Sequence, residues 1–103
     1  MATEAEIQRG IVKYLKRHAC VVYTTSQGYR PGGGTRVTAG LPDLLVIHSP
    51  GAWTFAEVKT PAGRMNHDQD VFALNAETAR IPWELWRSVD DAVAWAKAVG
   101  IVA

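Results

Sequence analysis

The chain has 103 residues, which suits one compact domain spanning residues 1–103 and leaves no room for two. Hydrophobic residues make up 48% and the net charge is +1, which excludes a disordered tail and a protein that coats DNA through its overall charge. No apolar run approaches the roughly 18 residues of a membrane span, and the single cysteine, Cys20, allows no internal disulfide, so we expect an intracellular, cytoplasmic protein.

The chain is predicted to begin with a helix, a strand and a loop. The helix covers residues 4–17, where Thr3 and Glu6 have the spacing of a capping box. Its apolar residues recur at helical spacing: Ile7, Ile11, Tyr14 and Leu15. Residues 20–25 are rich in β-branched and aromatic types and predict a strand, whereas 26–40, with five glycines and a proline, predicts a loop.

A β-hairpin is predicted next. Residues 44–47 form a continuous apolar run, which is typical of a strand covered on both faces. The Ser-Pro-Gly segment at 49–51 predicts a turn, and residues 53–59 predict the returning strand.

The last third of the chain predicts a helix, a strand and a final helix. The first of these helices covers about 66–78, and we expect three of its apolar residues to point inward: Val71, Phe72 and Leu74. Residues 82–86 predict a strand, and Ser88 caps the final helix, which ends near Gly100. The element order αβββαβα indicates an α/β fold in which helices flank a mixed sheet.

The final helix is more apolar than one buried face requires. Five of its residues form a core stripe: Val89, Ala92, Val93, Ala96 and Val99. Four further apolar residues remain: Trp95, Ala98, Ile101 and Val102. Because a surplus of exposed apolar surface marks subunit contacts, we expect a homodimer.

The residues that indicate chemistry are Asp43, Glu57 and Lys59. Side chains alternate along a strand, so Glu57 and Lys59 project from one face. A hairpin loop of three or five residues, or a bulge, places Asp43 opposite Glu57 on that face; Asp43 can also reach in from just before its strand. Mg²⁺ offsets the repulsion between two carboxylates and takes water and phosphate oxygens as further ligands, so the cluster predicts a magnesium site.

Several segments together resemble the VRR-NUC (virus-type replication-repair nuclease) family of the PD-(D/E)XK nuclease superfamily. They are Gly40-Leu41-Pro42-Asp43, Glu57-Val58-Lys59-Thr60-Pro61, Gly63-Arg64 and Gln69. The resemblance implies a restriction-endonuclease-like αβββαβα core and a DNA endonuclease that depends on Mg²⁺ or Mn²⁺. It also implies a dimer that presents two active sites to branched DNA, and it is compatible with a virus-encoded protein that acts in a host cell.

The resemblance assigns roles at the sheet end. Asp43 and Glu57 would hold the metal ion, helped by the Val58 carbonyl, and Lys59 would position and activate the attacking water. Because adjacent carboxylates favour the charged ammonium, we expect Lys59 to stabilise charge and orient water rather than to act as a simple base.

Two further positions are matched by the resemblance. Glu4 corresponds to the family's helix-one glutamate, because it lies on the apolar face of the first helix, and Glu6 is the fallback. Gln69 corresponds to the family glutamine, but Asn66 and Gln69 also have the spacing of a capping box, so Gln69 caps the helix, borders the site or does both.

Contacts with DNA are expected from arginines. Arg64 lies beside the proposed active-site strand and is the leading candidate for a phosphate contact, followed by Arg30 and Arg36 in the glycine-rich loop, which is otherwise a plain linker. That loop lacks the Gly-Lys-Ser/Thr signature of a P-loop, so we expect no nucleotide cofactor. Cationic residues of the first helix are interpreted as a solvated face: Lys13, Lys16 and Arg17.

The acidic cluster and the resemblance together predict a metal-dependent DNA endonuclease in replication, recombination or repair, and the resemblance implies selectivity for branched or four-way-junction DNA. The alternatives are a nicking or end-processing nuclease and a DNA-binding module that keeps the fold without turnover.

Overall fold

The computed structural model describes residues 1–25, 39–48 and 51–103. Within these ranges the elements are α1 (Glu4–Arg17), β1 (Val21–Thr24), β2 (Leu44–His48), β3 (Ala52–Val58), α2 (His67–Ala79), β4 (Trp83–Trp86) and α3 (Val89–Ala98). The predicted order αβββαβα is confirmed. None of the helices in the described ranges is long and apolar enough to cross a membrane.

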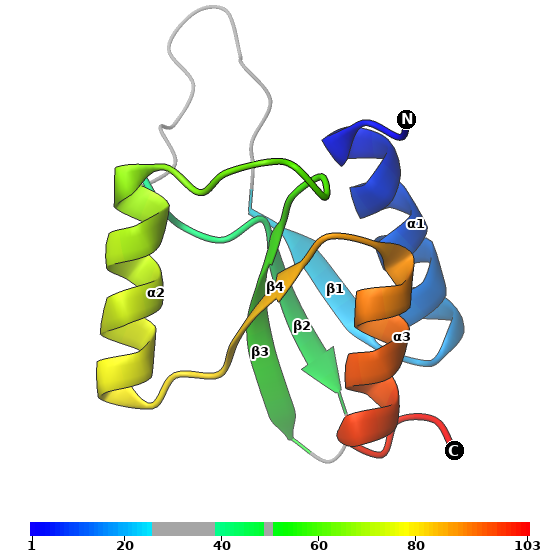
Figure 1. Ribbon diagram of the computed structural model, residues 1–103. Coiled ribbons are helices and arrows are strands. Elements are labelled where there is room, and N and C mark those ends of the chain that lie inside the picture. Colours follow the sequence, from blue (N-terminus) through cyan, green and yellow to red (C-terminus); the bar gives the residue numbers. More distant parts are fainter. Residues whose placement is uncertain (26–38, 49–50) are drawn as a thin grey trace, which may run out of the picture.

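The four strands form one mixed sheet in the order β1-β2-β3-β4. Strands β1, β2 and β3 are antiparallel neighbours, and β4 returns parallel to β3 after α2. Helices α1 and α3 pack together on one face of the sheet, while α2 lies on the other (Figure 1). The predicted flanking of a mixed sheet by helices is therefore confirmed.

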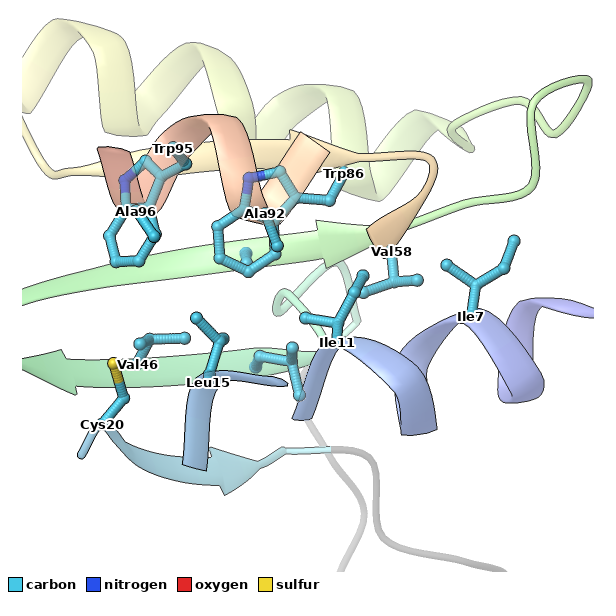
Figure 2. Packing of buried hydrophobic residues seen from close by; sticks show 12 residues of the cluster. Ile7, Ile11, Leu15, Cys20, Val46, Val58, Trp86, Ala92, Trp95 and Ala96 are labelled. Carbon is cyan, nitrogen blue, oxygen red and sulfur yellow. The ribbon is translucent and has the colours of Figure 1, made fainter. Parts of the chain in front are cut away.

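The hydrophobic core lies between the sheet and the α1–α3 pair (Figure 2). Helix α1 contributes one apolar stripe, formed by Ile7, Ile11 and Leu15. The inner sheet face contributes Leu44, Val46, Ala56, Val58 and Trp86, and α3 contributes Ala92, Trp95 and Ala96. Cys20 is also buried in this cluster. This core holds β2 and β3 rigidly, so the residues on their opposite face are fixed relative to one another.

The inward face of α2 differs from the prediction. Phe72 is half-buried and packs edge-to-face on Phe55, with ring centroids 5.3 Å apart, and Ala76 is buried one turn later. Val71 and Leu74, which were predicted to point inward, are 41% and 63% exposed. The physical reason is helix periodicity: positions 72 and 76 share the sheet-facing stripe, which turns 71 and 74 away from it.

The apolar surplus predicted for the final helix is also corrected. Trp95, predicted to lie outside the core stripe, is buried, whereas Val99, predicted to lie within it, is 44% exposed. Helix α3 ends at Ala98, and Ile101 and Val102 fold back onto the core. Most of the predicted surplus is thus covered within the chain, and α3 gives no reason to expect a subunit contact.

Candidate active site

The hairpin register brings the predicted acidic residues together. Leu44 pairs with Ala56 and His48 with Ala52, so three residues connect the strands. This confirms the expected odd-numbered loop. Asp43 directly precedes Leu44 and Glu57 directly follows Ala56, so the two carboxylates lie opposite each other at the open end of the hairpin, on the face that carries α2.

Asp43 is fixed by backbone contacts on two sides. Its Oδ2 accepts a hydrogen bond from the Val58 N–H at 2.8 Å. The Thr25 N–H donates to the Asp43 carbonyl at 2.8 Å, and the Thr25 hydroxyl donates to the Pro42 carbonyl. Thr25, which follows β1, therefore holds the backbone at Asp43, and Val58 at the end of β3 holds its carboxylate.

Glu57 is a buried acid with one cationic neighbour. It is 1% exposed, and the Lys59 Nζ lies 3.9 Å from its Oε1. The pKa of Glu57 is raised to about 8, first by burial and then by the charge of Asp43 and a hydrogen bond with it, while Lys59 acts in the opposite direction. Lys59 therefore does not offset the cost of a second negative charge at this buried position, and a bound cation would lower that cost.

Gln69 links α2 to the acidic pair. Its Oε1 accepts from the Asn66 N–H at 2.9 Å, which completes the capping box of α2. Its Nε2 donates to the Glu57 Oε1 at 2.9 Å. Gln69 therefore caps the helix and contacts Glu57 at the same time, which is one of the arrangements that the sequence predicted.

The first helix also reaches the acidic cluster. The first turns of α1 and α2 lie at the sheet end where β2 begins and β3 ends (Figure 1). Glu4 is half-buried, and its negative charge contributes to the raised pKa of Glu57. Glu6, the fallback, is exposed and bound to Thr3 in the cap of α1, with its Oε1 accepting from the Thr3 hydroxyl at 3.0 Å. The geometry therefore favours Glu4 as the helix-one carboxylate.

Two residues support the site in ways that sequence reasoning missed. The Arg87 Nη1 donates to the carbonyl oxygens of Thr60 at 2.8 Å and Gly63 at 2.7 Å, which ties down the turn that follows Lys59. Gly40 has a φ of +85°, and a Cβ at this position would collide with the backbone carbonyl of Asp68. Because β4 pairs in parallel with β3, Arg87 follows β4 at the same end of the sheet where Lys59 follows β3, and this pairing is the feature that could have predicted the Arg87 contact. Gly40 stood out in the sequence only as part of the Gly-Leu-Pro-Asp motif.

The arginines predicted to contact DNA are not all placed. Arg64 lies in the turn between β3 and α2 and is exposed. Arg30 and Arg36 lie outside the described residues. The predicted contacts of all three with DNA remain predictions.

The donor set fits a hard divalent cation. In residues 1–25, 39–48 and 51–103, no three His, Cys, Asp or Glu side chains gather into a ready-made metal site. Two carboxylates, Asp43 and Glu57, do meet, and the Val58 backbone is bound to one of them. Mg²⁺ is commonly held by one or two carboxylates together with water and substrate oxygens, so a site with few protein ligands suits it.

Comparisons with known proteins agree with this architecture. The chain matches no family model, and it matches no curated protein. A search of solved structures finds a chain described as a VRR_NUC domain, with a TM-score of 0.74 and 20% sequence identity. The match covers 93% of this chain and 97% of that chain. The protein therefore has the fold of a VRR_NUC domain, as the sequence motifs predicted.

Proposed function

We propose that the chain is a VRR-NUC nuclease that hydrolyses phosphodiester bonds of DNA with Mg²⁺ or Mn²⁺. The observation that carries this proposal is the meeting of Asp43, Glu57 and Lys59 at one end of the sheet, with Gln69 bound to Glu57. The fold shared with a VRR_NUC domain supports it.

The roles proposed for the residues follow from their positions. Asp43 and Glu57 would hold the metal ion together with the Val58 carbonyl. A bound divalent cation would supply Lewis-acid stabilisation of the phosphoryl oxygens and lower the pKa of water. Lys59, 3.9 Å from Glu57, would orient the attacking water and offset the negative charge of the transition state. Gln69 would keep the Glu57 carboxylate in one orientation through its 2.9 Å hydrogen bond.

Cleavage assays test the proposal directly. Fluorescently labelled duplex, flap and four-way-junction DNA are incubated with the protein in Mg²⁺, Mn²⁺ or EDTA. We expect cleavage in Mg²⁺ or Mn²⁺ that is lost in Asp43→Ala and Lys59→Ala and retained in Lys97→Ala, whose exposed lysine lies on α3 away from the site. Equal residual activity in the wild type and in Asp43→Ala would contradict the proposal. Relative rates on the three substrates distinguish a junction-selective nuclease from a nicking or end-processing one.

Metal binding is tested separately from turnover. Titration calorimetry with Mn²⁺ on the wild type is expected to show binding that is weakened at least tenfold in Glu57→Gln, because the substitution removes one of the two acidic ligands. Unchanged Mn²⁺ affinity in Glu57→Gln would remove this carboxylate from the proposed site. DNA binding in Ca²⁺ without cleavage in Mn²⁺ would favour the alternative of a non-catalytic DNA-binding module.

We also propose that the protein is a homodimer, and the structure locates the apolar surface on the sheet rather than on α3. One cross-strand row of side chains is exposed: Val21, Ile47 and Trp53 are 49%, 37% and 41% accessible. Tyr23, in the next row, is 57% accessible. Exposed apolar patches of this kind are typical of subunit contacts.

The oligomeric state tests this second proposal. Light scattering at micromolar concentration is expected to give a dimer, and Tyr23→Glu is expected to give a monomer because it places a charge in the apolar patch. Gln is the milder substitution: Tyr23→Gln should weaken the dimer without adding charge. A strictly monomeric wild type would contradict the proposal.

A further inference from the structure

A groove with three cations along one side lies between α1 and β1. Its volume is about 660 Å³. Helix α1 lines it with Arg9, Lys13 and Lys16, and β1 contributes Thr24. All three cations are exposed, and none of them forms an ion pair within the part of the chain that the structure describes. Glu6, the acid closest in sequence to Arg9, is bound to Thr3 in the helix cap.

The spacing of these cations is unfavourable for an isolated helix. Arg9 and Lys13 are four residues apart, and Lys13 and Lys16 are three apart, so like charges lie next to each other on one face. Like charges at this spacing destabilise a helix. A polyanion lying in the groove would relieve this repulsion, and none of the described residues that line the groove is acidic.

The groove leads to the candidate active site. Its end nearest the helix N-terminus is lined by Ala5, which directly follows Glu4. On the sheet side, Thr24 pairs with Leu44, so this part of the groove lies at the same end of the sheet as Asp43, which projects from the opposite face. A chain molecule that occupies the groove would therefore continue toward the acidic cluster.

The dimensions suit a nucleic-acid backbone. Lys16 lies seven positions after Arg9, which is about 10 Å along the helix at 1.5 Å per residue. This length corresponds to about three nucleotide steps of one DNA strand at 3.4 Å each. Among the described residues, the lining contains cations, Gln8 and Thr24 but no aromatic side chain. Such a surface binds phosphates through charge and hydrogen bonds, whereas the stacking of bases needs aromatic rings.

We infer that the groove formed by Arg9, Lys13, Lys16 and Thr24 holds the sugar-phosphate backbone of DNA beside the active site. This inference rests on the proposed function for the identity of the polyanion. It replaces the interpretation of the α1 cations as a solvated face, except for Arg17, which does not line the groove.

The salt dependence of DNA binding tests the inference. Fluorescence anisotropy measures the affinity of a labelled duplex for the wild type in EDTA over a series of salt concentrations. The groove variant carries Arg9→Gln, Lys13→Gln and Lys16→Gln. The matched control carries Arg17→Gln, Arg80→Gln and Lys97→Gln, which remove the same charge from exposed positions outside the groove. Glutamine is close to lysine and arginine in helix propensity, and circular dichroism confirms that both variants are folded.

Each phosphate contact contributes about −0.9 to the slope of log K against log salt for B-DNA. We expect the slope to become less negative by about 2 to 3 in the groove variant and by less than 1 in the control. Equal slopes in the groove variant and the control would overturn the inference. If the wild type binds no duplex at all, the inference and the proposed function both fail; groove-dependent binding without cleavage in Mn²⁺ would overturn the nuclease proposal alone.

Discussion

Replacing Glu57 by glutamine should change how the stability of the protein depends on pH. Glu57 is 1% exposed and lies opposite Asp43, and burial together with the neighbouring carboxylate raises its pKa from 4.5 to about 8. Between these two values the folded protein binds a proton that the unfolded chain has lost. The free energy of unfolding therefore falls as the pH rises through this window, and the contribution is lost fully above pH 8.

The magnitude follows from the pKa shift. One pKa unit corresponds to about 1.36 kcal/mol, so ionising Glu57 in the folded state lowers the free energy of unfolding by on the order of 2 kcal/mol between pH 6 and pH 8. Glutamine at position 57 keeps the shape of the side chain and can still accept the hydrogen bond from Gln69, but it does not titrate. Burial also raises the pKa values of Glu84 and Cys20, and these contributions cancel when the two proteins are compared.

Urea denaturation in EDTA measures the effect. Fluorescence of the buried Trp86 and Trp95 reports unfolding, and both proteins are measured at pH 6, 7 and 8. We expect the stability of Glu57→Gln relative to the wild type to rise by about 2 kcal/mol from pH 6 to pH 8. The contrary result is a difference in free energy of unfolding between the two proteins that stays constant within about 0.5 kcal/mol from pH 6 to pH 8. This result would show that Glu57 does not exchange its proton in this window. It would refute the electrostatic reasoning behind the cation site.

Three further substitutions test the supports of the site and the packing of the helices. Gly40→Ala should lower both stability and Mn²⁺ affinity, because its φ of +85° and the nearby Asp68 carbonyl leave no room for a Cβ; a variant that binds Mn²⁺ normally in calorimetry would contradict this. Arg87→Met should accelerate amide hydrogen exchange in the turn after β3, because it removes the donor to the carbonyl oxygens of that turn. Arg87→Lys should restore part of the protection, since the ammonium can donate to the same oxygens. Equal exchange in the methionine variant and the wild type would show that other contacts hold the turn. Gly10→Ala should destabilise the protein by about 1–3 kcal/mol, because its Cβ would lie 2.8 Å from Val89 Cγ2. In a Val89→Ala background the same change should be neutral or stabilising. A double-mutant cycle measured by urea denaturation that shows no such coupling would contradict the contact.

The local pattern of the sequence was sufficient to predict the elements and the acidic pair. The apolar stripe of α1, the apolar run of β2 and the cap residues Thr3, Asn66 and Ser88 fix helices and strands through interactions within a few residues. The two-residue period of a strand places Glu57 and Lys59 on one face, and an odd hairpin loop is enough to bring Asp43 opposite Glu57. These features depend on residues close together in the sequence, so the periodicity of the residues is enough to predict them.

Contacts between distant segments were decided only by the tertiary structure. The burial of Glu57 depends on α2 and Gln69, the turn after Lys59 is held by Arg87 from beyond β4, and the start of α2 lies against Gly40. The same holds for α2, whose stripe at positions 72 and 76 faces the sheet while Val71 and Leu74 remain exposed. No periodic signal links residues 12 to 28 positions apart, because such pairs meet only when the strand order and the helix docking bring them together. The sequence alone therefore determined which groups the site contains. The packing of the fold determined their burial, their charge state and the contacts that support them.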